Sequence, residues 1–168
     1  MEPSYIQKSQ ELYNLAEPEY ERYYYNEDTG GFVLLHQAHN TNYSELFVAL
    51  VFAKLGRRVK LLSEQAPSGV KTPDAEINGE IWEFKELSAE AVNIGNAFQR
   101  GVAIAKKRAP NLGYHINTIV DIKEVNKGLA RALVWDTDKR LKRIELIFND
   151  ETVQTLTREE LDYGQNFR

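Results

Sequence analysis

The sequence predicts an α/β fold in which helices flank a mixed β-sheet. Helical and strand-like periodicities alternate along its 168 residues, of which 42% are hydrophobic and 27% charged, as in a globular domain. This length suits one ordinary domain. We therefore expect a single domain over residues 1–168, with an acidic, tyrosine-rich arm at residues 1–40 packed on it.

Each element follows from its own periodicity. Apolar residues at every third or fourth position predict helices, and alternating ones predict strands. Helices are expected at residues 7–16, 42–55, 88–108 and 124–135. Strands are expected at residues 32–35, 58–62, 114–122 and 143–148, with a hairpin at 72–86 and a short element within 152–161.

The helix at residues 42–55 has a clear start and end. Asn42, followed three residues later by Glu45, has the spacing of a capping box. Gly56 directly follows the last apolar residue, Leu55, as glycine commonly does at a helix end.

The expected hairpin is the most informative segment. Asn78-Gly79 between alternating residues is the strongest short-range hairpin signal. A two-residue loop there puts Asp74 directly opposite Glu83. Lys85 lies two residues beyond Glu83 and therefore projects from the same face. The sequence thus predicts two carboxylates and an amine together on one face of the hairpin.

Such a group suits metal-assisted phosphodiester cleavage. Asp74 and Glu83 could bind a divalent cation, with Mg²⁺ the expected ion, and the cation can generate hydroxide from bound water. Lys85 could orient that water or stabilise negative charge in the transition state. The alternative is an ion triad on a solvated sheet face.

These residues resemble the signature of the PD-(D/E)XK nuclease superfamily, which reads here Pro73-Asp74 and then Glu83-Phe84-Lys85. The expected order of elements also resembles the αβββαβ, restriction-endonuclease-like core of that superfamily. The resemblance implies a nuclease in which Asp74 and Glu83 bind the metal and Lys85 positions water.

The resemblance also implies two assisting residues. An acidic residue on the first core helix often joins the metal site, and Glu45 matches it, although capping the helix explains Glu45 equally well. A polar residue often follows on the helix after the lysine strand, and Gln99 matches that position, where simple solvation is an equal alternative.

The segment from Gly69 to Lys85 is similar to the C-terminal toxin domains of CdiA proteins of bacterial contact-dependent growth inhibition. This similarity implies a ribonuclease, with tRNA as substrate, a cytoplasmic site of action and an immunity protein as partner. A similar hairpin sequence occurs in toxin and phage proteins with an α+β, barnase-like fold. That fold, and cleavage without a metal, therefore remain open.

Basic residues offer contacts to nucleic acid. The net charge is −5 over residues 1–55, +5 over 56–143 and −4 over 144–168. The first group of cations that could grip phosphates consists of Arg100, Lys106, Lys107 and Arg108. Their position near a helix C-terminus is also favourable without any ligand. The second group, Lys139, Arg140, Lys142 and Arg143, could equally be exposed charge flanking a strand.

Other functions stay open from the residues alone. His36, His39 and His115 allow a metal-independent ribonuclease that uses an imidazole as general acid or base. A DNA endonuclease of the same fold and a non-catalytic module that binds nucleic acid or neutralises a toxin are further alternatives. The sequence does not decide the oligomeric state.

Composition excludes several classes of protein. The absence of cysteine excludes disulfide scaffolds and thiolate metal sites. No apolar run approaches the length of a membrane span, and Met1-Glu2-Pro3 begins no Sec signal peptide. We therefore expect no membrane partner and no Sec export.

Overall fold

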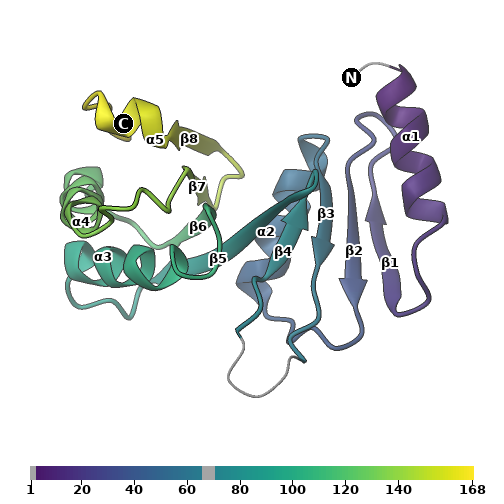
Figure 1. Ribbon diagram of the computed structural model, residues 1–168, viewed down its shortest axis with the longest axis horizontal. Coiled ribbons are helices and arrows are strands. Elements are labelled where there is room, and N and C mark those ends of the chain that lie inside the picture. Colours follow the sequence, from purple (N-terminus) through teal and green to yellow (C-terminus); the bar gives the residue numbers. More distant parts are fainter. Residues whose placement is uncertain (1–2, 66–70) are drawn as a thin grey trace. The chain divides into compact units, whose positions relative to one another are not determined.

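The computed structural model describes residues 3–65 and 71–168 (Figure 1), so Gly69 and Val70 lie outside the described residues. The helices are α1 (Pro3–Asn14), α2 (Tyr43–Lys54), α3 (Ile94–Ala105), α4 (Ile122–Val134) and α5 (Arg158–Asp162). The strands are β1 (Tyr20–Tyr25), β2 (Phe32–His36), β3 (Arg58–Leu61), β4 (Ala75–Ile77), β5 (Glu80–Ser88), β6 (Asn111–Asn117), β7 (Arg143–Phe148) and β8 (Val153–Thr157).

Parallel and antiparallel strands are combined, in the order β1-β2-β3-β4-β5-β6-β7-β8. The pairs β2/β3, β5/β6 and β6/β7 are parallel, whereas β1/β2, β3/β4 and β7/β8 are antiparallel. This confirms the predicted α/β fold with a mixed sheet and flanking helices. The expected succession αβββαβ is also present, from α2 to β6.

The chain divides into two compact units, which we call the N-terminal unit (residues 1–81) and the C-terminal unit (residues 82–168). The boundary falls within β5, whose first two residues belong to the N-terminal unit. The single domain expected over the whole chain stays a prediction. Among the described residues, none of the helices combines the length and apolar character needed to cross a membrane.

The first 40 residues supply two strands and a helix to the N-terminal unit. α1 packs on the sheet face that carries Phe32 and Arg58: the Tyr13 and Phe32 ring centroids are 5.6 Å apart, and Arg58 Nε donates to Ser9 Oγ at 2.8 Å. The tyrosine-rich stretch that we expected to be an arm forms β1, which pairs with β2.

α2 packs against β2 and β3. Its predicted start is confirmed, because Asn42 is the N-cap and its side chain accepts a hydrogen bond from the Glu45 amide at 2.8 Å. The end of the helix lies very close to β2: a Cβ added to Gly31 would overlap the Ala53 carbonyl oxygen. Only glycine allows this approach, which brings the α2 backbone onto the sheet.

The predicted hairpin turn is confirmed. Asn78 and Gly79 separate β4 from β5 and have φ values of 49° and 86°. Positive φ at both positions is the requirement of a type I′ two-residue hairpin turn, which Asn-Gly meets at low cost. Asn78 Oδ1 also accepts a hydrogen bond from the Arg58 amide at 2.8 Å, which ties the turn to β3.

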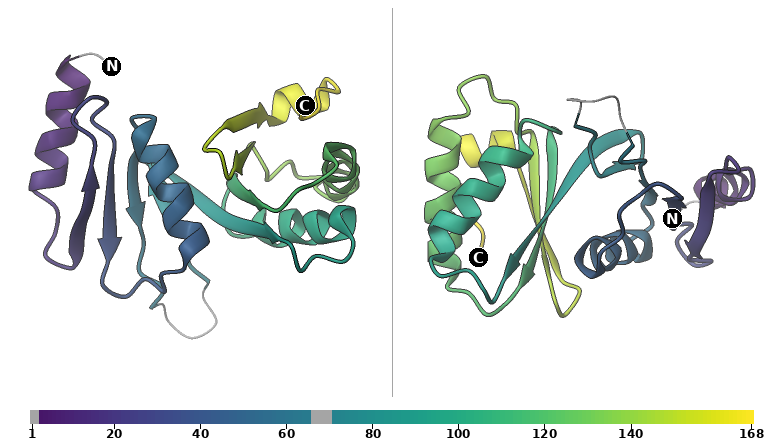
Figure 2. Two further views of the ribbon diagram at one scale, coloured as in Figure 1. Left: turned by 180° about the vertical axis from the view of Figure 1, so that it is seen from behind. Right: turned by 90° about the horizontal axis from the view of Figure 1, so that it is seen from below.

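In the C-terminal unit, α3 and α4 cover one face of the strands (Figure 2). The core between them contains Leu112, Tyr114 and Ile116 from β6 and Ile144 and Leu146 from β7. Phe98 of α3 stacks on Tyr114, with ring centroids 4.3 Å apart. The three parallel strands are therefore held against the helices by a continuous apolar layer.

Several element boundaries differ from the sequence prediction. The helix expected from residue 88 begins at Ile94, because β5 continues to Ser88, which pairs with Asn117, and Asn93 caps the helix. That helix ends at Ala105, so residues 106–108 follow it. The strand expected at 114–122 runs from Asn111 to Asn117. The element expected within 152–161 is a strand followed by a short helix, β8 and α5.

Replacing Gly101 with alanine tests how α3 packs on β6. In an exposed helix this change stabilises by about 1 kcal/mol, but a Cβ at Gly101 would overlap the Tyr114 hydroxyl. We expect Gly101→Ala to lower the free energy of unfolding, measured in urea, by about 1–3 kcal/mol. Adding Tyr114→Phe should recover part of the loss. A Gly101→Ala protein as stable as the wild type would contradict this packing.

Candidate active site

Asp74 lies in the N-terminal unit, directly before β4, and only 9% of its surface is exposed. Its backbone carbonyl accepts a hydrogen bond from the Leu62 amide at 3.0 Å. This bond continues the antiparallel pairing past the last residue of β3 and the first residue of β4. The position of Asp74 is therefore fixed by the sheet.

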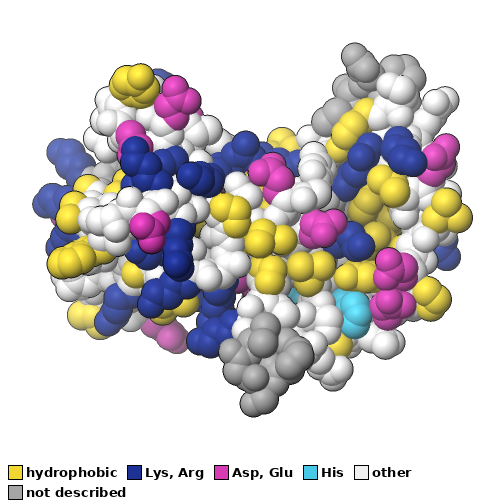
Figure 3. Space-filling model, viewed as in Figure 1, with side chains coloured by type: hydrophobic (Ala, Val, Ile, Leu, Met, Phe, Trp, Pro, Cys, Tyr) yellow, Lys and Arg dark blue, Asp and Glu magenta, His cyan; other side chains and the backbone are white. Residues whose placement is uncertain are grey.

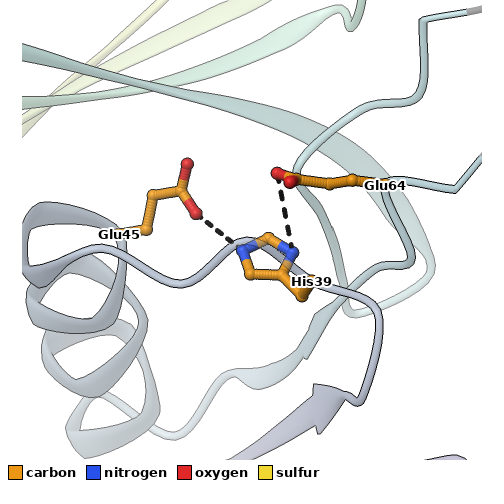
Figure 4. Close-up of side chains that lie close together, drawn as sticks. All are labelled: His39, Glu45 and Glu64. Carbon is orange, nitrogen blue, oxygen red and sulfur yellow. Dashed lines mark hydrogen bonds and ion pairs between the residues drawn. The ribbon is translucent and has the colours of Figure 1, made fainter.

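Glu45 and His39 form a close pair in the same unit (Figure 4). His39 Nε2 is 2.6 Å from Glu45 Oε2, and Nδ1 is 2.7 Å from the Leu62 carbonyl oxygen. Leu62 is also the residue that binds the Asp74 backbone. The predicted residues Glu45 and Asp74 are thus linked through His39 and the backbone of Leu62.

A third group, Glu64, lies on the other side of the imidazole, with Oε1 4.0 Å from His39 Nδ1. Ligand atoms of His39, Glu45 and Glu64 all lie within 4.8 Å of one another, which is close enough for a metal ion. However, both imidazole nitrogens face oxygen acceptors at hydrogen-bond distance. The arrangement therefore fits a doubly protonated imidazolium better than a metal ligand.

The C-terminal unit holds Glu83 and Lys85, both on β5. They pair with Leu112 and Tyr114 of β6, so they lie on the sheet face that α3 covers. Glu83 is fully buried, and its Oε2 accepts a hydrogen bond from Arg108 at 2.6 Å. A solvated surface triad, the alternative weighed from the sequence, does not fit a carboxylate shielded from water in this way.

Lys85 is half-buried on the same strand. Within residues 3–65 and 71–168, its amine makes no hydrogen bond or ion pair. The Lys85 amine is therefore available to a ligand.

The remaining predicted site residues lie on or just after α3. Gln99 is half-buried on the side of α3 that meets α4, where its backbone amide approaches Gly128. No hydrogen bond among the described residues joins Gln99 to Glu83 or Lys85. Arg100 is exposed. The structure therefore brings neither of these two residues to β5 through a polar contact.

The three cations after α3 have different surroundings. Lys106 Nζ donates to the Trp135 carbonyl at 3.1 Å and lies 3.7 Å from Asp136 Oδ1. Lys107 is exposed, whereas Arg108 is paired with Glu83. Of the three, Lys107 is thus the cation most available to a phosphate.

The other two histidines do not join the His39 pair. His36 is half-buried in β2, and its Nδ1 accepts a hydrogen bond from the Ala38 amide at 2.9 Å. His115 is fully buried in β6 of the C-terminal unit, with Nε2 2.6 Å from Asn149 Oδ1. Their spacing in the sequence therefore did not reveal which histidine would contact a carboxylate.

Sequence reasoning missed the partners of two predicted residues. Neither the His39–Glu45 contact nor the Arg108–Glu83 contact follows from periodicity, because both depend on tertiary packing. The only available signal was charge: Glu83 sits in an otherwise apolar strand segment, Trp82 to Phe84, and therefore requires a cationic partner.

Comparison with known proteins bears on the segment that contains these residues. Residues 71–153 match the family described as contact-dependent growth inhibition CdiA C-terminal domain. The match covers just under half of the chain and includes Asp74, Glu83 and Lys85. It confirms, for this segment, the resemblance to CdiA C-terminal toxin domains. No curated protein sequence matches the chain.

A solved structure is also similar in part, the "CdiA-CT/CdiI toxin and immunity complex from Burkholderia pseudomallei". The sequence identity is 16% and the TM-score 0.46, with 68% of this chain and 84% of that chain covered.

Folding stability should depend on pH through His39. Burial alone lowers the pKa of His39, but hydrogen bonds to Glu45 and Leu62 and the charges of Glu45 and Glu64 together raise the pKa. Because the pKa of His39 is higher in the folded state, protonation of His39 stabilises the fold. This contribution is complete below the unfolded-state pKa of about 6.5 and is lost as the pH rises through the folded-state pKa. In urea titrations, the difference in free energy of unfolding between wild type and His39→Gln should therefore shrink as the pH rises above about 6.5.

Glu45→Gln tests the same pair from the other side, because it removes the charge of Glu45 and keeps the size of the side chain. We expect it to flatten the same pH dependence. A wild-type advantage over His39→Gln that stays constant from acidic to alkaline pH would contradict an imidazolium at this position.

Substitutions of the neighbouring residues Arg108 and Lys107 should differ in their effects on stability. Removing Arg108 leaves the Glu83 carboxylate buried without its cation, so Arg108→Ala should lower the free energy of unfolding by about 2–3 kcal/mol. Lys107→Ala removes an exposed charge and should change it by no more than about 0.5 kcal/mol. Equal effects of the two substitutions in thermal or urea denaturation would show that the Glu83–Arg108 pair is not structural.

Proposed function

We propose that the chain is a nuclease of PD-(D/E)XK type that hydrolyses phosphodiester bonds in RNA, with tRNA as substrate, by a metal-assisted mechanism. The observation that carries this proposal is the buried Glu83 carboxylate with Lys85 on the same face of β5. The similarity of residues 71–153 to CdiA C-terminal domains supports a toxic, nucleolytic activity.

Asp74 and Glu83 are the ligands that we propose for a hard divalent cation. Asp74 and Glu83 offer carboxylate oxygens that are largely shielded from water, and such oxygens are the ligands Mg²⁺ prefers. When bound there, the ion would supply Lewis acidity and a water of lowered pKa. Glu83 would contribute to the ion while its carboxylate is held by Arg108.

Lys85 and Glu45 have distinct proposed roles. Lys85 would place its amine against the attacking water or the phosphate oxygen on which negative charge develops. Glu45 would act through its link to Leu62, which holds the segment that carries Asp74. Gln99 stays a proposed assisting residue on the strength of the superfamily resemblance alone.

A second candidate function rests on the His39–Glu45 pair. A protonated imidazole held by a carbonyl and a carboxylate can act as general acid on the leaving oxygen after attack by a ribose 2′-hydroxyl. The 2.6 Å contact to Glu45 supports this metal-independent ribonuclease. The full burial of the His39 side chain opposes it, since a general acid must reach the substrate.

The toxin resemblance extends the proposal to partners and place of action. We propose an immunity protein as a binding partner and the cytoplasm of a target cell as the place where RNA is cut.

The test is a cleavage assay with tRNA and with plasmid DNA, each in Mg²⁺ and in EDTA. We expect tRNA cleavage in Mg²⁺ that falls by at least about 100-fold in Asp74→Asn and in Lys85→Met, the loss typical of a removed electrostatic group. Glu76→Gln, on the same hairpin, and Lys71→Met are matched controls and should cleave at the wild-type rate.

Other results would redirect the assignment. Cleavage that resists EDTA and disappears in His39→Gln would favour the metal-independent ribonuclease. Plasmid cleavage with intact tRNA would indicate a DNA endonuclease. Binding of either nucleic acid without cleavage would indicate a non-catalytic module. Full tRNA cleavage by both Asp74→Asn and Lys85→Met would overturn the site itself.

A further inference from the structure

Two basic segments of the C-terminal unit, residues 106–110 and 135–142, lie side by side. The Lys142 amide donates to the Pro110 carbonyl at 2.7 Å, and Lys106 Nζ donates to the Trp135 carbonyl at 3.1 Å. We call these two segments the basic edge. The sequence contains them as separate groups of cations, and the structure joins them at the amino ends of β6 and β7.

The second segment is held in place by Asp136, which is buried. Its carboxylate accepts hydrogen bonds from the amides of Arg140 at 3.1 Å and Leu141 at 3.0 Å, and from Arg158 at 2.6 Å. Although burial alone raises the pKa of Asp136, these contacts together lower it, so the carboxylate stays charged. The backbone that presents Arg140 is therefore fixed before any ligand binds.

Three cations of the basic edge remain available. Lys106 and Lys139 are in ion pairs with Asp136 and Asp162. Lys107, Arg140 and Lys142 are exposed and, among the residues that the structure describes, have no acidic partner within ion-pair distance.

A hollow of about 310 Å³ lies between these segments. It is lined by residues 106–110 and Arg140. Figure 3 shows Lys and Arg side chains gathered over the part of the molecule that contains α3 and α4. A hollow bordered by cations suits the phosphates of a nucleic acid backbone.

An aromatic side chain adjoins the same edge. Trp135 is 75% exposed, whereas the other tryptophan, Trp82, is 1% exposed. Exposed aromatic rings beside cations are the combination with which proteins bind single-stranded nucleic acids, because every unpaired base offers a face for stacking. The bases of a duplex are stacked on one another and offer no such face.

We propose that the basic edge binds an unpaired segment of RNA, with phosphates on Lys107, Arg140 and Lys142 and a base stacked on Trp135. This inference rests on the proposed function, which it extends from RNA in general to unpaired RNA. The residues involved are separate from Asp74, Glu83 and Lys85, so the edge positions the substrate and takes no part in the chemistry.

The two tryptophans make a direct test possible. Titration of the full chain with a single-stranded 2′-O-methyl RNA of about 12 nucleotides in EDTA, which prevents cleavage, should quench Trp135 fluorescence. Trp135→Ala should abolish the quenching and weaken binding about 10-fold, as measured by anisotropy of labelled RNA. A duplex of the same length should bind more weakly than the single strand.

The charged contacts are tested by Lys107→Ala/Arg140→Ala/Lys142→Ala. We expect at least a 10-fold loss of affinity and a salt dependence that is shallower by about two units of slope, from three lost single-strand contacts. The control Lys8→Ala/Lys123→Ala/Lys127→Ala makes the same change of charge at other exposed positions. Equal losses in both triple variants would overturn the proposal, as would equal affinity for duplex and single strand.

Two further outcomes separate this inference from the proposed function. If tRNA is cleaved in Mg²⁺ but Trp135 is not quenched by the RNA, the basic edge is overturned and the nuclease stands. If the RNA binds as expected but no cleavage occurs in Mg²⁺, the edge stands and the nuclease fails. Displacement of the RNA by an equal concentration of poly-glutamate would instead indicate an acidic protein partner and overturn the proposal.

Discussion

The pair of Glu83 and Arg108 is the interaction on which the C-terminal unit depends. A carboxylate taken out of water destabilises a fold unless a cation compensates, and Arg108 does so at 2.6 Å. The pair fixes the Glu83 carboxylate and joins β5 to the segment that follows α3. Because Arg108 is paired with Glu83, it is less available to phosphates than the exposed residues Lys107, Arg140 and Lys142 of the basic edge.

The N-terminal unit also contains a buried charged group with compensating partners, the histidine His39. His39 is buried, yet its two nitrogens face Glu45 and the Leu62 carbonyl, so its charge is compensated on both sides. Leu62 in turn holds the backbone of Asp74. Each unit therefore contains a residue predicted from the sequence that is held by buried polar contacts: the Glu83 carboxylate in one unit and the Asp74 backbone in the other.

Local signals in the sequence predicted much of this structure, and tertiary contacts account for the rest. Asn78-Gly79 predicted the hairpin because few other residue pairs tolerate positive φ at both positions. The start of α3 was placed too early because Ser88 continues β5 by pairing with Asn117, a contact that no local pattern reveals. The partners of Glu45 and Glu83 were missed for the same reason: the positions of His39 and Arg108 depend on how the chain packs.

Binding of Mn²⁺, measured by isothermal titration calorimetry, tests the central claim most directly, since it depends on neither substrate nor cleavage. The account predicts saturable binding to the wild-type chain that is lost in both Asp74→Asn and Glu83→Gln and kept in Glu76→Gln. Saturable binding that survives Asp74→Asn and Glu83→Gln, or no binding to the wild-type chain, would contradict a metal site built from Asp74 and Glu83.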